Sequence, residues 1–146
     1  MPTETPRVFI DADVLFAGSA SASAHGASLV VLRMSEITLV QAITSVQVIT
    51  EVERNLAQKL PRALPAFHLL VNRSLTVVAD PTIPALQEYT GLADAKDLPI
   101  LVTAVREQCP WLITFNTRHF RPGHVSVTVL PPGAYIQRVR HLLTQR

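Results

Sequence analysis

The chain has 146 residues, of which 48% are hydrophobic and 16% are charged, and its net charge is +2 at pH 7. This length suits one domain over residues 1–146, and no apolar run approaches the roughly 18 residues of a membrane span. The polar N-terminus lacks the features of a secretory signal, which predicts a cytoplasmic protein, and the single cysteine excludes an internal disulfide. A charged fraction below the roughly 25% of average soluble domains predicts a heavily buried sheet and a homodimer or higher oligomer.

The first predicted element is a buried strand over residues 8–10, which ends at Asp11. In open α/β sheets, functional groups gather beyond the carboxyl ends of the strands, so Asp11 is a candidate site residue. The alternative is that Asp11 or Asp13 only caps a helix that begins near Val14. The small residues over 16–24 predict a surface loop.

Helices and strands then alternate along the chain. A helix is expected to begin at Thr44, because Gln47 completes the spacing of a capping box, and to end before Pro61. Other helices are predicted over residues 25–34, 64–72, 82–89, 97–105 and 133–143, and strands over 37–43, 74–79, 111–114 and 125–130. The apolar strands predict a three-layer α/β/α domain with a mostly parallel sheet, a flexible N-terminus over 1–6 and a C-terminal helix within 131–146.

Three carboxylates, Asp11, Glu51 and Asp97, follow one another at intervals of roughly 40 residues, each where an α/β sheet places groups along one edge. Carboxylates brought close together repel one another unless a divalent cation neutralises them. Oxygen ligands without thiolates suit Mg²⁺ or Mn²⁺. The alternative for Glu51 is an ordinary solvated position at the margin of its helix.

Four segments carry a resemblance to the PIN domain family of small metal-dependent nucleases, which includes the toxins of VapBC-type pairs. They are Phe9 to Leu15, Thr44-Ser45 with Glu51-Val52, Asp97 to Leu101 with Ala104, and Leu112 to Phe120. They stand in the order that the family requires and span roughly residues 7 to 120. The resemblance implies a PIN-like fold and a Mg²⁺- or Mn²⁺-dependent endoribonuclease that acts with an antitoxin.

The same resemblance implies roles for particular residues. The catalytic residues are Asp11, Glu51, Asp97 and Asn116, of which the three acids bind metal. Accessory residues are Asp13, Thr44, Ser45, Asp94 and Thr114. Arg118, His119 and Arg121 would contact RNA phosphates, unless they belong to an ordinary solvated loop.

Two departures from the family leave alternatives open. The family commonly has an acid where Asn116 stands and an asparagine where Asp13 stands. Asn116 offers only a neutral oxygen, which predicts one firmly bound ion, while Asp13 either caps the helix, the interpretation we favour, or replaces the missing acid. The rival functions are a catalytically degenerate binding module and an RNA-processing nuclease without an antitoxin. A nucleotide-binding domain is disfavoured, because the five glycines form neither a P-loop nor a G-x-G-x-x-G motif.

Overall fold

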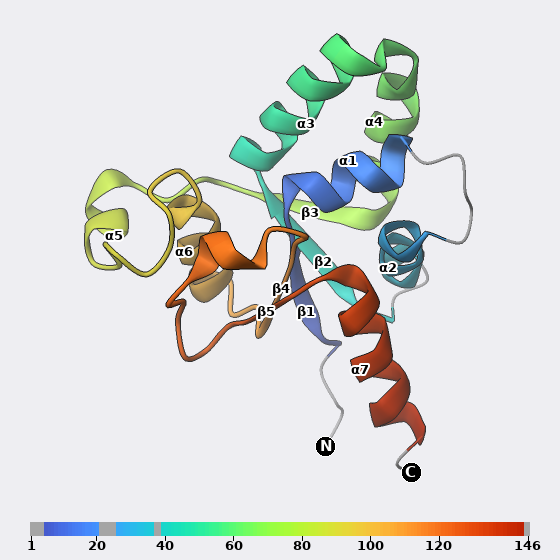
Figure 1. The fold of residues 1–146 in the computed structure, drawn as a ribbon. Coiled ribbons are helices and arrows are strands. Elements are labelled where there is room, and N and C mark those ends of the chain that lie inside the picture. Colours follow the sequence, from blue (N-terminus) through green and yellow to red (C-terminus); the bar gives the residue numbers. More distant parts are fainter. Residues whose placement is uncertain (1–4, 21–25, 37–38, 145–146) are drawn as a thin grey trace.

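The computed structural model describes residues 5–20, 26–36 and 39–144. Its centre is a five-stranded sheet in the order β3-β2-β1-β4-β5 (Figure 1). The strands are β1 (Arg7–Ile10), β2 (Gln41–Ser45), β3 (Leu75–Val78), β4 (Trp111–Ile113) and β5 (Thr128–Leu130). All the pairings between neighbouring strands are parallel, which confirms the predicted sheet.

Helices flank the sheet on both sides, as the alternation of elements predicted. Figure 1 shows α6 on one side of the sheet and α1, α2 and α7 on the other. The helices are α1 (Ala12–Ala20), α2 (Ala27–Glu36), α3 (Val46–Lys59), α4 (Leu64–Ser74), α5 (Ile83–Gln87), α6 (Leu98–Arg106) and α7 (Pro132–Thr144), with short 3-10 turns η1 (Pro61–Ala63) and η2 (Thr117–Phe120). Within the described residues, none of these helices combines the length and apolar character needed to cross a membrane.

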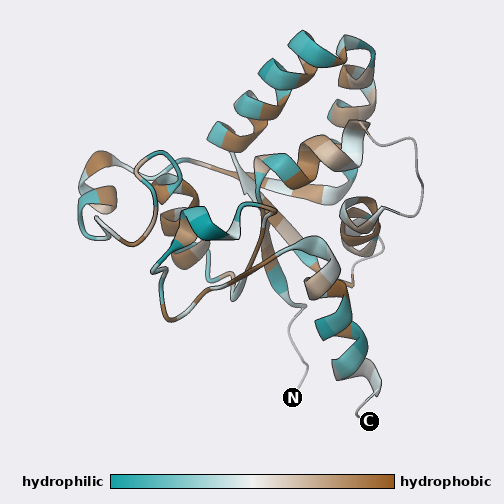
Figure 2. Ribbon diagram, in the orientation of Figure 1, coloured by the Kyte–Doolittle hydropathy of each residue, from teal (hydrophilic) through white to brown (hydrophobic). Residues whose placement is uncertain are grey.

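The hydrophobic core lies around β1, whose Val8, Phe9 and Ile10 are fully buried. A central parallel strand is covered on both faces, so its sequence is continuously apolar instead of alternating. The helix α3 is different, because its buried side chains recur at Val48 and Val52, one turn apart. Figure 2 shows hydrophobic central strands and an alternation of hydrophilic and hydrophobic segments along α3.

The predicted loop over residues 16–24 is wrong for residues 16–20, which continue α1, while 21–25 lie outside the described residues. The small residues serve close packing between helices instead of chain flexibility. A Cβ atom at Gly18 would lie 2.7 Å from the side chain of Leu32 on α2. Tertiary packing of this kind sets helix length more strongly than local composition does.

The helix α3 begins later than the capping box predicted. Ser45, not Thr44, is its N-cap, and the Ser45 hydroxyl accepts a hydrogen bond from Val48 N at 3.4 Å. Thr44 is still part of β2, and its hydroxyl donates to the carbonyl of Ile10 at 3.0 Å across the sheet. The sheet therefore uses the hydroxyl that the sequence pattern assigned to the cap.

Two predicted strands begin several residues later than expected. The strand predicted over 37–43 begins only at Gln41, and residues 37–38 lie outside the described residues. The strand predicted over 125–130 begins only at Thr128, because Val125 is fully exposed and cannot be a core position. In both cases an apolar composition extended the prediction into a connecting segment.

Candidate functional site

A cavity of about 250 Å³ is bordered by the residues that follow β1 and β4 and by one side of α3. Its lining combines carboxylates, amides, two lysines and a histidine: Asp11, Ala12, Asp13, Phe16, Glu51, Asn55, Lys59, Lys96, Asp97, Asn116 and His119. The structure therefore brings all four predicted catalytic residues around one cavity. Parallel strands explain this, since their carboxyl ends meet at one edge of the sheet.

Asp11 is the most buried carboxylate of this cavity, with 8% of its surface exposed. Its Oδ1 accepts a hydrogen bond from Ala12 N at 2.8 Å, and its Oδ2 accepts one from Thr114 Oγ1 at 2.9 Å. Burial and, to a lesser extent, the neighbouring charge of Asp13 raise the pKa of Asp11, the two hydrogen bonds oppose them, and the net result is a pKa of about 7. The protein alone therefore compensates the negative charge of Asp11 only in part.

Asp13 connects α1 with the segment that follows β4. It lies in the first turn of α1, and its carboxylate accepts hydrogen bonds from Phe115 N at 3.0 Å and from Asn116 Nδ2 at 3.1 Å. Thr114 Oγ1 lies 3.3 Å from the same carboxylate oxygen. Burial raises the pKa of Asp13, while these hydrogen bonds and one from Val14 lower it. A role as helix cap therefore accounts for few of the contacts of Asp13, since most of them join its carboxylate to the residues that follow β4.

Glu51 reaches the cavity from α3, where it belongs to a stripe of side chains. Glu51, Asn55 and Lys59 follow at intervals of four residues, so they share one side of the helix, and all three line the cavity. The buried positions Val48 and Val52 hold the helix against the core and place Glu51 at the margin, as the sequence predicted.

Asp97 occupies the N-cap position of α6, but its side chain makes no capping hydrogen bond. Its Oδ2 is buried, lies 3.2 Å from His119 Nδ1 and has no hydrogen bond of acceptable geometry among the described residues. Burial raises the pKa of Asp97, while the charges of His119 and Lys96 lower it. A buried carboxylate oxygen that faces only one imidazole keeps room for a further ligand such as a cation.

Among the described residues, one group of three offers ligand atoms within 4.8 Å of one another: Asp94, Asp97 and His119. Asp11 and Glu51 line the same cavity but are not members of this group. The predicted metal ligands therefore surround a shared space without all being in mutual contact. Hard carboxylate oxygens with one imidazole, a partly compensated Asp11 and a buried Asp97 oxygen without a capping hydrogen bond together fit a divalent cation such as Mg²⁺ or Mn²⁺.

The remaining predicted site residues support the cavity or lie outside it. Thr44 and Ser45 serve β2 and the start of α3, and Thr114 is fully buried beneath Asp11. Arg118 and Arg121 are exposed at and after η2 and do not line the cavity.

The sequence prediction missed three polar lining residues, Asn55, Lys59 and Lys96, and two apolar ones, Ala12 and Phe16. The helical spacing from Glu51 could have indicated Asn55 and Lys59, since residues four and eight positions further share its face. Adjacency to Asp97 could have indicated Lys96.

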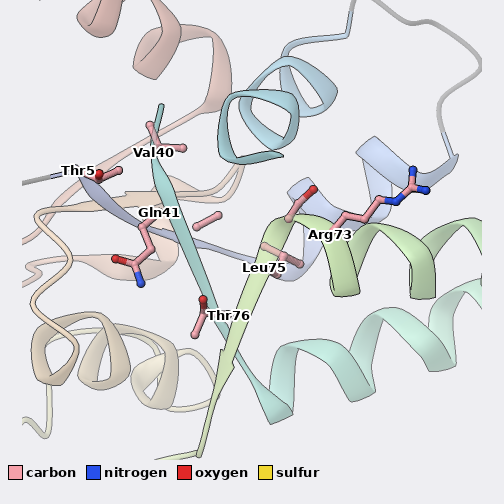
Figure 3. Close-up of a pocket in the computed structure, with 8 residues that line it drawn as sticks. Thr5, Val40, Gln41, Arg73, Leu75 and Thr76 are labelled. Carbon is pink, nitrogen blue, oxygen red and sulfur yellow. The ribbon is translucent and has the colours of Figure 1, made fainter. Parts of the chain in front are cut away.

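A second cavity, of about 320 Å³, lies where β2 and β3 begin (Figure 3). Figure 3 shows Gln41 on β2, Thr76 on β3 and Arg73 extending from the end of α4. The lining of this second cavity contains no carboxylate and consists of Thr5, Val40, Gln41, Ala42, Arg73, Ser74, Leu75 and Thr76. The second cavity therefore offers no acidic ligands for a cation, in contrast to the cavity around Asp11.

Thr114→Val tests the support beneath Asp11. We expect the variant to lose about 1–3 kcal/mol of unfolding free energy at about pH 8, because the ionised carboxylate of Asp11 loses a buried donor. The loss should be smaller at about pH 5, where Asp11 is largely protonated and is itself a donor. Urea denaturation at both pH values measures the effect.

Thr103→Val is the matched control, since Thr103 is also buried and its hydroxyl donates to the carbonyl of Pro99 at 2.7 Å. In the described part of the chain this hydroxyl donates to a main-chain carbonyl and not to a carboxylate, so the effect of its loss should not depend on pH in this range. Equal losses for both variants at both pH values would contradict the role given to Thr114.

Comparison with known proteins agrees with this geometry. The chain is similar to a solved structure described as the crystal structure of VapBC2 from Rickettsia felis bound to a DNA fragment from their promoter. The TM-score is 0.62 with 13% sequence identity, and the match covers 84% of this chain and 96% of that chain. No curated protein sequence matches the chain. The PIN domain family matches residues 7–118, most of the chain, and the chain therefore belongs to the PIN domain family.

Proposed function

We propose that the chain is a Mg²⁺- or Mn²⁺-dependent endoribonuclease that hydrolyses RNA phosphodiester bonds. The observation that carries this proposal is the gathering of Asp11, Asp13, Glu51 and Asp97 around one cavity, where the buried Oδ2 of Asp97 has His119 Nδ1 at 3.2 Å as its neighbour and no capping hydrogen bond. Four carboxylates around about 250 Å³ repel one another strongly without a cation. A binding module that needed no metal would have no use for such an arrangement.

Asp11, Glu51 and Asp97 would hold the ion. When bound, a divalent ion polarises a phosphate oxygen and lowers the pKa of a water molecule for attack on phosphorus. The chain contributes orientation, because Ala12 N and Thr114 Oγ1 fix both oxygens of Asp11. Asn116 offers a neutral amide that Asp13 holds in place.

Other polar residues near the cavity would serve binding. Asp94 would assist Asp97, whose oxygen it approaches within 4.8 Å. Arg118, His119 and Arg121 are proposed to contact substrate phosphates, with His119 at the cavity and the two arginines on exposed surface beyond it.

We further propose that the chain is the toxin of a VapBC-type pair, with an antitoxin as partner and a homodimer or higher oligomer as its assembly. Support comes from the fold it shares with a chain of VapBC2, of which the match covers 96%. A low charged fraction of 16% supports a buried subunit interface.

Glu51→Gln tests the nuclease function. The wild type should cleave a labelled single-stranded RNA with Mn²⁺ and lose this activity with EDTA. The kcat/KM of the variant should fall by more than roughly 100-fold. Mutation of a residue that only supports a metal ligand typically costs roughly 10- to 100-fold, and Glu51 is proposed to bind the ion itself.

Glu53→Gln is the control, because Glu53 lies on the same helix but pairs with His68 at 2.9 Å and does not line the cavity. It should retain the activity of the wild type. A wild-type protein that binds Mn²⁺ but never cleaves RNA would contradict the proposal and favour the degenerate binding module.

A further inference from the structure

The charges of this chain are distributed unevenly around the cavity. Lys59 and Lys96 are the only lysines of the sequence, and the other eleven of its 13 basic residues are arginines. Both lysines line the acidic cavity, whereas none of the arginines in the described part of the chain does. A general excess of basic surface does not explain this placement.

The two lysines mark opposite ends of one side of α3. Gln47, in the first turn of α3, has its Nε2 3.5 Å from the carbonyl oxygen of Lys96. Lys59 is the last residue of the same helix, about 18 Å further along at 1.5 Å per residue. Along the helix, Glu51 lies between the end near Lys96 and the end at Lys59, on the stripe that faces the cavity.

Each lysine is exposed and available to a ligand. The Lys59 ammonium lies 5.7 Å from the ring centre of Phe16, which holds it at the cavity wall through a cation–π contact. The positive charge of Lys96 acts on Asp97, which is its neighbour in the chain and in the cavity. The alternative role for Lys59 is a favourable charge at the C-terminal end of a helix.

We propose that Lys59 and Lys96 bind the RNA phosphates on either side of the phosphate that is cleaved. This inference rests on the proposed nuclease function and names the path of its substrate, along α3 from Lys96 past Glu51 to Lys59. The ammonium groups offset the repulsion between a polyanion and the four carboxylates of the cavity. The lysines provide affinity for the RNA and fix which of its phosphates lies at the acids, while the acids form the metal site.

Binding of a fluorescein-labelled single-stranded RNA in EDTA tests this proposal without cleavage. Lys59→Gln and Lys96→Gln should each reduce the slope of log K against log salt concentration by roughly 0.7, and weaken binding roughly five- to tenfold at low salt. Lys59→Arg and Lys96→Arg should keep the slope of the wild type. Fluorescence anisotropy over a series of KCl concentrations gives both quantities.

Arg54→Gln is the matched control, since Arg54 is an exposed cation of α3 that does not line the cavity. Its salt slope should stay close to that of the wild type. Titration with Mn²⁺ should show no weaker binding for either lysine variant than for the wild type, because each variant removes a positive charge beside the acids, and this separates phosphate binding from the metal site. With Mn²⁺ present, the variants should show a raised KM and an unchanged kcat.

The outcomes separate this proposal from the nuclease function. If the salt dependence of RNA binding by the wild type depends on the two lysines but the protein never cleaves RNA, phosphate binding by the lysines is supported and the nuclease function is contradicted. If the lysine variants behave like Arg54→Gln, or if the wild type binds no RNA, the proposal that Lys59 and Lys96 bind RNA phosphates is overturned.

Discussion

Asp11→Asn is expected to stabilise the metal-free protein while abolishing its response to Mn²⁺. The carboxylate of Asp11 is buried beside the charge of Asp13, and burial raises its pKa to about 7. Asparagine keeps an acceptor for Ala12 N, and its amide can donate to Thr114 Oγ1. The Thr114 hydroxyl can then donate to Asp13, whose oxygen lies at 3.3 Å. The variant therefore removes a charge without leaving a buried group unpaired.

The gain should grow with pH in a defined window. An acid whose folded-state pKa is raised from 3.8 to about 7 contributes stability below its unfolded pKa and loses it as pH rises towards the folded pKa. This rise in the pKa from 3.8 to about 7 corresponds to at most about 4 kcal/mol of unfolding free energy. The unfolding free energies of variant and wild type should thus be similar at about pH 4 and differ most above about pH 7.

Urea denaturation in EDTA over this pH range measures the stability, and thermal melting with added Mn²⁺ measures the response to metal. The wild type should gain stability from Mn²⁺ at about pH 8, because a bound ion relieves the charge of Asp11, and the variant should not. Glu88→Gln, at an exposed position outside the cavity, should follow the wild type in both measurements. If the variant is less stable than the wild type at about pH 8, the buried charge of Asp11 does not destabilise the metal-free protein and this prediction is wrong.

The parts of the site that follow directly from the parallel sheet could be predicted from the sequence. The position of Asp11 at the end of a buried strand is predictable, because the apolar run before it is long enough for a strand and too apolar for an exposed one. Glu51 is placed by the hydrophobic period of its helix, and Asp97 by the proline at the start of α6. Local patterns and the rule that parallel strands end at one edge were sufficient for these residues.

Contacts between residues far apart in the chain could not be predicted in this way. Nothing in the spacing of Asp97 and His119 indicates that Nδ1 and Oδ2 lie 3.2 Å apart, because this contact depends on how η2 follows β4. The same limit applies to Asp13, whose partners follow a strand more than 100 residues later. For residues 16–20, composition pointed to a loop, whereas packing of Gly18 against Leu32 produced a helix.

Asn116→Asp is expected to lower the melting temperature in EDTA and to increase the shift that Mn²⁺ produces. In the wild type, Asn116 Nδ2 donates to Asp13 Oδ2 at 3.1 Å. A carboxylate at position 116 would place an oxygen where this donor stands, and the two acids would repel each other. The cost at about pH 8 should be about 1–3 kcal/mol in metal-free protein. A bound cation offsets this repulsion and gains a ligand, so the apparent affinity for Mn²⁺ should rise, together with the rate of RNA cleavage.

The double variant Asp13→Asn/Asn116→Asp exchanges the carboxylate and the amide across the same contact. It should recover most of the stability lost by Asn116→Asp, because one donor and one acceptor again face each other at 3.1 Å. The two changes should therefore be non-additive by about 0.5–3 kcal/mol, as expected for side chains in direct contact. Unfolding free energies of the wild type, both single variants and the double variant give this coupling.

Metal titration of the same four proteins decides what Asp13 contributes to the ion. If Asp13 only positions Asn116, Asp13→Asn should weaken Mn²⁺ binding modestly, and the site should hold one ion firmly through Asp11, Glu51 and Asp97. If Asp13 has replaced the missing acid, Asp13→Asn should abolish Mn²⁺ binding while Asn116→Asp changes nothing. The second pattern would overturn the assignment of a single ion held by three acids, because the fourth carboxylate would then be a ligand in its own right.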